Sequence, residues 1–174
     1  RVIELLNNFK QVAADQVIGE TREVDIVNYV NEVMSTLSAE IKKHRVDYRY
    51  QGETELTVKT LPGALAQVVT NLVTNSLKHG FDGVSDGLIT IDISQDQDKV
   101  QLKYQDNGNG MSKEVLHNIF EPFFTTKRNS GGTGLGMNIV FNIIRQKLKG
   151  DISVDSEPGK GSCFTICLPT SVDD

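Results

Sequence analysis

Apolar side chains recur along the chain at two spacings, one typical of helices and one typical of strands. Spacings of three and four residues place apolar side chains on one face of a helix. We expect helices over 1–16, 26–42, 62–80, 112–118 and about 134–148. The third of these begins at Pro62, a residue type that is favoured in a first helical turn.

Segments that alternate between apolar and polar residues indicate half-buried strands. We expect strands over 22–26, 46–51, 56–59, 87–94, 100–106, 151–156 and 162–169. The last four form two pairs, each joined by turn-forming residues, which predicts two antiparallel hairpins. Helices mixed with hairpin strands predict an α+β fold: a two-layer sandwich of one mixed, mostly antiparallel sheet with helices on one face.

The length and composition fit a single soluble domain. The chain has 174 residues, of which 38% are hydrophobic and 24% charged. Its apolar stretches are far shorter than the roughly 18 residues that a membrane span needs. The first residues, RVIELLNNFKQ, are amphipathic rather than signal-like, and the chain does not begin with Met. We therefore expect a piece of a longer protein, whose remainder can carry a membrane anchor.

The charge and the cysteines narrow the setting. A net charge of −5 argues against nucleic acid as a partner, because phosphate backbones are bound by basic surfaces. Cys163 and Cys167 lie four residues apart on one expected strand, about 13 Å from each other. That separation is too long for a disulfide. We expect buried thiols on the same side of the strand and a reducing, cytoplasmic setting.

Polar side chains form a stripe on the expected helix 62–80. Asn71, Asn75 and Lys78 occupy positions i, i+4 and i+7 of one face, and His79 follows. One interpretation is a solvated helix face. The other is a metal and phosphate site, because an amide oxygen can ligate Mg²⁺ and Lys78 supplies a point charge for phosphates.

The segment DNGNG, residues 106–110, directly follows an expected strand. Asn-Gly pairs commonly form turns, so a simple turn is one interpretation. Alternatively, the Asp106 carboxylate accepts a hydrogen bond from an adenine amino group. Gly108 and Gly110 would then let the backbone approach the base closely.

Two further segments have no helical or strand periodicity. Three phenylalanines occur in IFEPFFTTK, residues 119–127, which is either core or the base of a lid whose Thr and Lys side chains face phosphates. GGTGLG, residues 131–136, opens an expected helix, and helix N-termini suit phosphate. Its glycine spacing fits neither the dinucleotide-binding motif nor the P-loop, and a lid hinge is also consistent with it.

Taken together, these segments resemble the sequence boxes of sensor histidine kinases. NLVTNSLKH resembles their N box, DNGNGM the first glycine box, IFEPFFTTK the F box and GGTGLGMNIV the second glycine box. GKGSCFTICLP resembles their last strand, with Ser162 where Thr is common. Order and spacing agree over roughly 62–169. LLNNFKQVAADQ resembles the end of the second dimerisation-domain helix, so we expect 1–16 to be a remnant of that helix and 17–174 to be the catalytic ATP-binding domain.

The resemblance implies a Bergerat-type fold, which is shared with gyrase, Hsp90-type chaperones and mismatch-repair ATPases, with a flexible ATP lid over 120–133. It implies ATP and Mg²⁺ as cofactors, with Asn75 as the metal ligand and Asn71 supporting the metal–phosphate region. Lys78 would contact phosphate, His79 would lie beside the ribose or adenine, and Asp106 would bind the adenine amino group. The nucleotide-binding residues implied in this way are Asn71, Asn75, Lys78, His79, Asp106, Gly108, Gly110, Phe123, Thr125, Thr126, Lys127, Gly132, Thr133, Gly134, Leu135 and Gly136.

The resemblance also implies γ-phosphoryl transfer to a histidine in two-component signal transduction. Hydrolytic relatives have a Glu at the Asn71 position, and an amide cannot replace it as a base for water. His44 and His117 lack the acceptor motif, and we expect both to be surface or packing residues. The acceptor is therefore expected on an absent dimerisation domain. A Bergerat-type ATPase and a non-catalytic nucleotide-binding module are the alternatives.

The same resemblance implies the partners. They are the dimerisation domain of the same protein and a downstream response regulator, with no nucleic acid. We expect a homodimeric full-length protein, a chain that by itself can be monomeric, and a cytoplasmic domain whose parent protein can be anchored in the inner membrane.

Overall fold

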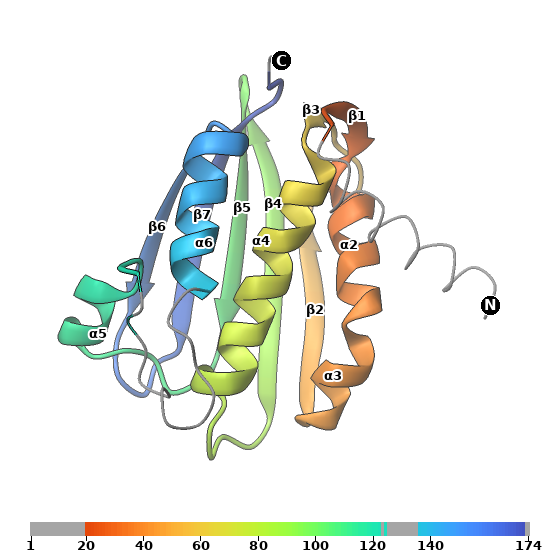
Figure 1. Ribbon diagram of the computed structural model, residues 1–174. Coiled ribbons are helices and arrows are strands. Elements are labelled where there is room, and N and C mark those ends of the chain that lie inside the picture. Colours follow the sequence, from red (N-terminus) through yellow and green to blue (C-terminus); the bar gives the residue numbers. More distant parts are fainter. Residues whose placement is uncertain (1–19, 123, 125–135, 173–174) are drawn as a thin grey trace.

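The protein folds into two layers, a five-stranded sheet and a set of helices on one of its faces (Figure 1). The structure, a computed structural model, describes residues 20–122, 124 and 136–172. The strand order in the sheet is β2-β4-β5-β7-β6. Their bounds are Val46–Gly52, Gly87–Asp96, Lys99–Asp106, Ser162–Pro169 and Asp151–Ser156 in that order. β2 pairs with β4 in parallel, and the other pairs are antiparallel.

Helices α2, α4 and α6 lie across one face of this sheet (Figure 1). They span Ile26–Thr36, Pro62–Asn75 and Gly136–Asn142, while α3 and α5 are the short helices Ser38–Lys43 and Lys113–Asn118. Single π turns continue α4 and α6: η1 is Ser76–Gly80 and η3 is Ile143–Lys147. No described helix has the length and apolar character needed to cross a membrane.

The core lies between the two layers and follows from the alternation in the strands. Residues of β4, β5 and β7 are buried at every second position, so one face of each strand packs against the helices. Helix α4 contributes Leu65, Val68, Val69 and Leu72, none of which is exposed to solvent. This packing holds α4 against the sheet and so positions its last turn near the end of β5.

A small second sheet pairs β1, Arg22–Asp25, with β3, Thr57–Thr60, in antiparallel register. Asp25 also caps α2, because its Oδ1 atom accepts a hydrogen bond from the backbone N–H of Val27 at 3.1 Å. The same oxygen accepts the N–H of Leu56 at 3.1 Å. One carboxylate therefore joins the start of α2 to the segment that leads into β3.

The predicted α+β sandwich and both hairpins are confirmed. The single helix predicted over 26–42 is wrong, since α2 ends at Thr36 and α3 begins at Ser38. The prediction of buried thiols is also wrong. On β7 the alternate residues Ser162, Phe164 and Ile166 face the helices, so Cys163 and Cys167 lie half-exposed on the opposite face. Both are free cysteines, as their spacing predicted.

Candidate functional site

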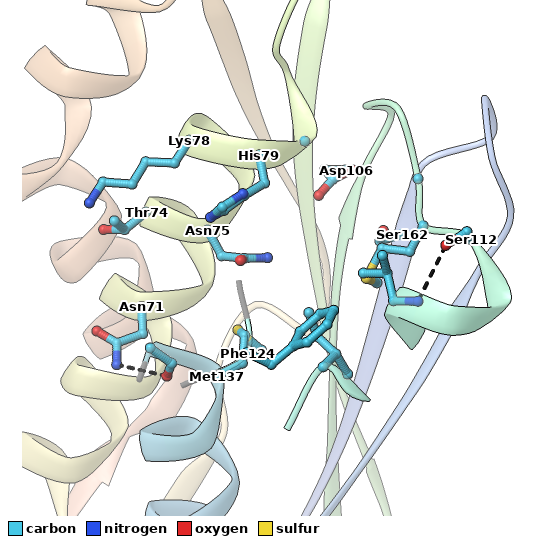
Figure 2. Close-up of a pocket in the computed structure, with 16 residues that line it drawn as sticks. Asn71, Thr74, Asn75, Lys78, His79, Asp106, Ser112, Phe124, Met137 and Ser162 are labelled. Atoms are coloured by element: carbon cyan, nitrogen blue, oxygen red, sulfur yellow. Dashed lines mark hydrogen bonds between the residues drawn. The ribbon is translucent and has the colours of Figure 1, made fainter. Parts of the chain in front are cut away.

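A cavity of about 230 Å³ lies where the end of α4 approaches the end of β5 (Figure 2). Helix α5 and the start of α6 complete its walls. Its lining consists of Asn71, Thr74, Asn75, Lys78, His79, Gly80, Asp106, Gly110, Met111, Ser112, Val115, Ile119, Phe124, Gly136, Met137 and Ser162. The cavity therefore joins polar side chains at one end of α4 to an apolar wall and a buried carboxylate.

The polar stripe of α4 and η1 forms one side of this cavity. Figure 2 shows the Asn75 amide on the side of the helix that faces Asp106, whereas the Lys78 side chain extends away from Asp106 in this view. Within the part of the chain that the structure describes, neither side chain makes a hydrogen bond or an ion pair. Both groups are therefore available to a ligand.

Asn71, one turn earlier, is already engaged on both sides. Its Oδ1 atom accepts a hydrogen bond from Gln67 Nε2 at 2.8 Å. Its Nδ2 atom donates to the backbone carbonyl of Gly136, another residue of the cavity lining, at 3.3 Å. The oxygen that a metal would use is thus occupied in Asn71 and unoccupied in Asn75.

The donor set is consistent with Mg²⁺ held together with a phosphorylated ligand. Among the described residues there is no group of three or more His, Cys, Asp or Glu side chains that could hold a metal alone. Mg²⁺ is commonly bound through few protein oxygens, with waters and substrate phosphates as its other ligands. One amide oxygen, from Asn75, and the Lys78 ammonium of the same cavity lining fit that mode.

Asp106 is the last residue of β5 and is only 4% exposed. Its Oδ2 atom accepts a hydrogen bond from Ser76 Oγ at 2.7 Å, and its Oδ1 atom accepts the N–H of Gly108 at 3.0 Å. Burial raises the pKa of Asp106, and the hydrogen bonds from Ser76, Gly108 and Ser162 act in the opposite direction. The cavity thus contains a desolvated carboxylate that is partly compensated by fixed donors.

The glycines of the segment 106–110 are required by the protein's own backbone. A Cβ atom on Gly108 would lie 2.3 Å from the carbonyl oxygen of Gly80. One on Gly110, whose φ is +71°, would lie 1.9 Å from the carbonyl oxygen of Glu157. Gly110 lines the cavity and Gly108 does not. Close approach to a base is therefore not the reason for Gly108; close approach to Gly80 is.

The asparagines of the same segment tie the loop to the chain beyond α4. Asn107 Oδ1 accepts the N–H of Leu88 at 2.7 Å, and Asn107 Nδ2 donates to the carbonyl of Asp86 at 3.1 Å. Asn109 N and Nδ2 donate to the carbonyls of Gly80 and Asp82, each at 2.7 Å. The loop that follows Asp106 is thereby fixed against the end of η1.

An apolar wall faces the Asn75 amide across the cavity. Figure 2 shows Phe124 and Met137 below Asp106, on the α6 side. Met111, Val115 and Ile119 continue this wall from the β5–α5 loop through α5. A flat aromatic ligand gains from such a surface, because ligand pockets are mostly apolar with a few placed polar groups.

The structure brings seven of the predicted site residues to this cavity: Asn71, Asn75, Lys78, His79, Asp106, Gly110 and Gly136. Eight others lie outside the described residues, namely Phe123, Thr125, Thr126, Lys127, Gly132, Thr133, Gly134 and Leu135, as does most of the expected lid. The expected helix 1–16 lies outside them as well. Sequence reasoning missed Thr74, Gly80, Met111, Ser112, Val115, Ile119, Phe124, Met137 and Ser162 as lining residues, although the boxes contain or adjoin most of them.

The remaining histidines lie at the surface. His44 is exposed at the C-terminal end of α3, where its Nδ1 atom is 2.9 Å from the carbonyl of Glu40. His117 is exposed on α5. Neither lines the cavity. This agrees with the prediction that both are surface or packing residues.

Comparison with known protein sequences finds relatives that are kinases and a match to one ATPase family. Residues 60–172 match the family described as histidine kinase-, DNA gyrase B-, and HSP90-like ATPase. The chain is 34% identical over 151 residues to the sensor histidine kinase ZraS of Escherichia coli (strain K12), covering 86% of this chain and 31% of ZraS. It is 32% identical over 170 residues to sporulation kinase A of Bacillus subtilis (strain 168), covering 97% of this chain and 27% of that kinase. The chain thus spans about a third or less of these curated relatives.

Solved structures agree with the sequence matches. The catalytic domain of the histidine kinase ThkA superposes with a TM-score of 0.76 at 29% identity, covering 87% of this chain and 97% of that one. ThkA has also been solved in complex with the response regulator protein TrrA, with a TM-score of 0.71 at 23% identity over 97% of this chain and 49% of that one. With its two-layer fold and its cavity between α4 and β5, the chain belongs to the histidine kinase-, DNA gyrase B-, and HSP90-like ATPase family, as the catalytic, ATP-binding domain of a sensor histidine kinase.

Proposed function

We propose that this domain binds Mg²⁺-ATP in the cavity and transfers the γ-phosphoryl group to a histidine on the dimerisation domain of the same protein. One observation carries the proposal. Asn75 and Lys78, which have no side-chain partner among the described residues, line the same cavity as the buried carboxylate of Asp106. A ligand with an amino-bearing base at one end and phosphates at the other matches both sets of groups.

The base is proposed to lie at the Asp106 end. An adenine ring would pack between the apolar wall and α4, with its amino group donating to the Asp106 carboxylate. A buried polar contact of this kind contributes roughly 1–3 kcal/mol. His79, which also lines the cavity on the Asp106 side of η1, is proposed to lie beside the ribose or the base.

The phosphates are proposed to lie towards Asn75 and Lys78. Mg²⁺ neutralises charge on the transferring phosphoryl group when it is bound. Asn75 would supply one amide oxygen to it, and Lys78 a point charge to the phosphates. Asn71 would act indirectly, because its amide already joins Gln67 to Gly136 and so holds α4 against α6. Phosphoryl transfer depends chiefly on such positioning and charge neutralisation.

Transfer is favoured over hydrolysis because the described lining of the cavity offers water no carboxylate base beside Asn75. The residue one turn before Asn75 is Asn71, whose amide cannot take a proton at neutral pH. The only carboxylate that lines the described cavity is Asp106, and its two oxygens are held by Ser76 and Gly108 at the base end. A histidine acceptor needs less help, since neutral imidazole is already nucleophilic near its pKa of about 6.5.

The partners follow from the same reasoning. The dimerisation domain must supply the acceptor histidine, because neither surface histidine of this chain reaches the cavity. A response regulator is proposed as the next phosphate acceptor, which the complex of ThkA with TrrA supports. The parent protein is proposed to be a homodimer with this domain in the cytoplasm, and residues 1–16 are proposed to end its dimerisation helix.

The test has two stages. Calorimetric titration of the 174-residue chain with Mg²⁺-ATP is expected to give binding at micromolar to millimolar concentration. Mixing the loaded chain with its dimerisation domain and labelled ATP is then expected to place label on a histidine. Absence of binding at millimolar nucleotide would refute the proposal. Binding without transfer would favour a nucleotide-binding module, and rapid phosphate release by the chain alone would favour an ATPase.

A further inference from the structure

Behind Asp106 lies a series of two buried hydroxyl groups that the proposed function has not used. Tyr104 and Ser76 are both fully buried, Tyr104 on β5 and Ser76 at the start of η1. The Tyr104 hydroxyl donates to Ser76 Oγ at 2.9 Å, and Ser76 Oγ donates to Asp106 Oδ2 at 2.7 Å. Neither Tyr104 nor Ser76 lines the cavity, and the hydrogen-bonded route from their hydroxyl groups to the cavity runs through Asp106.

When Asp106 is ionised, the direction of each hydrogen bond in this series of hydroxyl groups is fixed. An ionised carboxylate only accepts, so the single hydroxyl proton of Ser76 points at Asp106. The Ser76 oxygen must then accept from Tyr104. Burial raises the pKa of Tyr104, so its hydroxyl keeps the proton that it donates. Both hydroxyl protons, of Tyr104 and of Ser76, therefore point towards Asp106. A rotation of the Ser76 hydroxyl would leave buried polar atoms without partners.

These contacts also fix the orientation of the carboxylate. Ser76 holds Oδ2 while the Gly108 N–H holds Oδ1 at 3.0 Å. Gly80 packs closely on the same group, since a Cβ atom there would lie 3.3 Å from Oδ2. Asp106 nevertheless lines the cavity, so its remaining acceptor capacity is directed at whatever occupies it. A base edge that meets Asp106 must donate a hydrogen, and a carbonyl oxygen in the same place would face a carboxylate.

From this geometry we propose that Ser76, supported by Tyr104, is a positioning residue that holds Asp106 as an acceptor of fixed direction and so makes the cavity select a purine with an amino group over one with a carbonyl. This rests on the proposed nucleotide site. Without the Ser76 hydroxyl, the carboxylate loses one of its fixed donors and part of the compensation for its burial. It becomes both freer to turn and easier to protonate.

The decisive variant is Ser76→Ala in the 174-residue chain, with Mg²⁺-bound ATP, inosine triphosphate and purine riboside triphosphate as probes. These bases carry an amino group, a carbonyl and a hydrogen at the same position. We expect Ser76→Ala to lower the affinity for ATP roughly tenfold, the size expected for the loss of one hydrogen bond to a charged group. The affinity of the variant for purine riboside triphosphate should stay within about twofold of the wild-type value. The preference of the variant for ATP over the other two nucleotides is therefore smaller than that of the wild-type protein.

Two further variants separate positioning from simple destabilisation. Tyr104→Phe keeps the ring against Phe164 and removes only the second hydroxyl, so it should shift the same ratio in the same direction by a smaller factor. Thr60→Ala removes a buried hydroxyl that has no hydrogen-bond partner among the described residues, and it should leave the ratio unchanged. Ser76→Thr keeps the hydroxyl, so its ratio of ATP affinity to purine riboside triphosphate affinity should return to the wild-type value. If Ser76→Ala does not fold, Tyr104→Phe decides.

A pH series gives a readout that a merely structural role would not move. The ratio of ATP to purine riboside triphosphate affinity cancels the titration of the phosphates. It should fall on acidification as Asp106 is protonated, and it should begin to fall at higher pH in Ser76→Ala. Equal losses of affinity for all three nucleotides in Ser76→Ala, or a pH profile identical to that of the wild type, would overturn the proposed role of Ser76. Nucleotide binding by the wild-type protein would in that case still support the proposed nucleotide site. Absence of binding in the wild-type protein would overturn both.

Discussion

The side-chain amide of Asn71 donates a hydrogen bond to the backbone carbonyl of Gly136, 65 residues further along the chain. Asn71 lies one turn before the end of α4, and Gly136 is the first residue of α6. Because Gln67 donates to the other atom of the same amide, Asn71 acts as a bridge from the middle of α4 to α6. The two helices that flank the cavity are therefore joined by one side chain of its lining.

Asn71→Ala should lower the free energy of unfolding by about 0.5–1.5 kcal/mol, the usual net value of a hydrogen bond within a protein. The loss should appear as a lower midpoint in thermal or urea unfolding. Asn28→Ala is a matched control, because Asn28 makes an exposed i,i+4 hydrogen bond to Glu32 on α2, away from the cavity. The control should change stability by less than about 0.5 kcal/mol. Equal effects of the two variants would contradict a bridging role.

Gly108→Ala should destabilise the fold by about 1–3 kcal/mol, as overpacking of a tight site usually does. The reason is the 2.3 Å distance between a Cβ atom at this position and the carbonyl oxygen of Gly80, a backbone atom that cannot rotate away. Gly136→Ala provides the comparison, since its Cβ would meet nothing within 4 Å. Differential scanning calorimetry should find a lowered midpoint for the first variant alone.

The buried carboxylate of Asp106 should leave a signature in the pH dependence of stability. Its pKa is raised in the folded state above the ordinary 3.8, chiefly by burial. Between these two pKa values the folded state binds the proton more tightly than the unfolded state. The contribution of Asp106 to stability is therefore fully present below about 3.8 and is lost as pH rises through the folded pKa.

The measurement is a comparison of wild type with Asp106→Asn by urea unfolding between pH 4 and 8. The difference in unfolding free energy should fall from acid pH through the folded pKa and then stay constant, because Asn does not titrate. Other carboxylates contribute equally to both proteins and cancel. A difference that rises with pH would mean that the hydrogen bonds from Ser76, Gly108 and Ser162 outweigh burial.

The elements that sequence predicted well are those with one dominant signal. The strict alternation of 87–94 and 100–106 fixed both the strands and the buried face. The break at Leu37 had no such signal, because Leu37 continues the apolar spacing and no Gly or Pro interrupts it. Its physical basis is local: the Thr36 hydroxyl donates to the carbonyl of Val33 at 2.6 Å, a contact that bends helices.

The cavity was predictable in its polar half and not in its apolar half. Asn71, Asn75 and Asp106 are polar residues in patterns that the sequence shows directly: an i,i+4 pair on one helix and an Asp-Asn-Gly segment after a strand. Met111, Val115 and Ile119 are apolar residues that any core would accept, so only their tertiary position reveals them. The π turn η1, whose Phe81 N–H reaches the Ser76 carbonyl at 2.9 Å, likewise has no sequence signature.

Ser76 is the sharpest case of a residue that sequence could not assign. A serine in a helix interior is ordinary, and its hydroxyl often bonds locally. Here both partners of its hydroxyl lie on β5, at positions 104 and 106. The pairing arises only when α4 packs on the sheet.

The last prediction concerns the choice between transfer and hydrolysis. Water is a poor nucleophile until a base takes its proton, and the cavity has no carboxylate beside Asn75 for that purpose among the described residues. ATP turnover by this chain alone should therefore be slow. Labelled phosphate should instead appear on the histidine of an added dimerisation domain.

Asn75→Ala should abolish that transfer by removing the amide oxygen proposed for Mg²⁺, while Asn28→Ala should leave it unchanged. The metal dependence adds a second readout. In the wild-type protein nucleotide affinity should fall when Mg²⁺ is chelated, and in Asn75→Ala it should already be low and respond weakly to the metal. If Asn75→Ala kept full Mg²⁺ dependence of binding, the metal would have to be held elsewhere. The described lining of the cavity has no base beside Asn75, so it gives water no advantage over imidazole. Brisk phosphate release by the wild-type chain, with no label on the added histidine, would therefore overturn the proposed transfer to histidine.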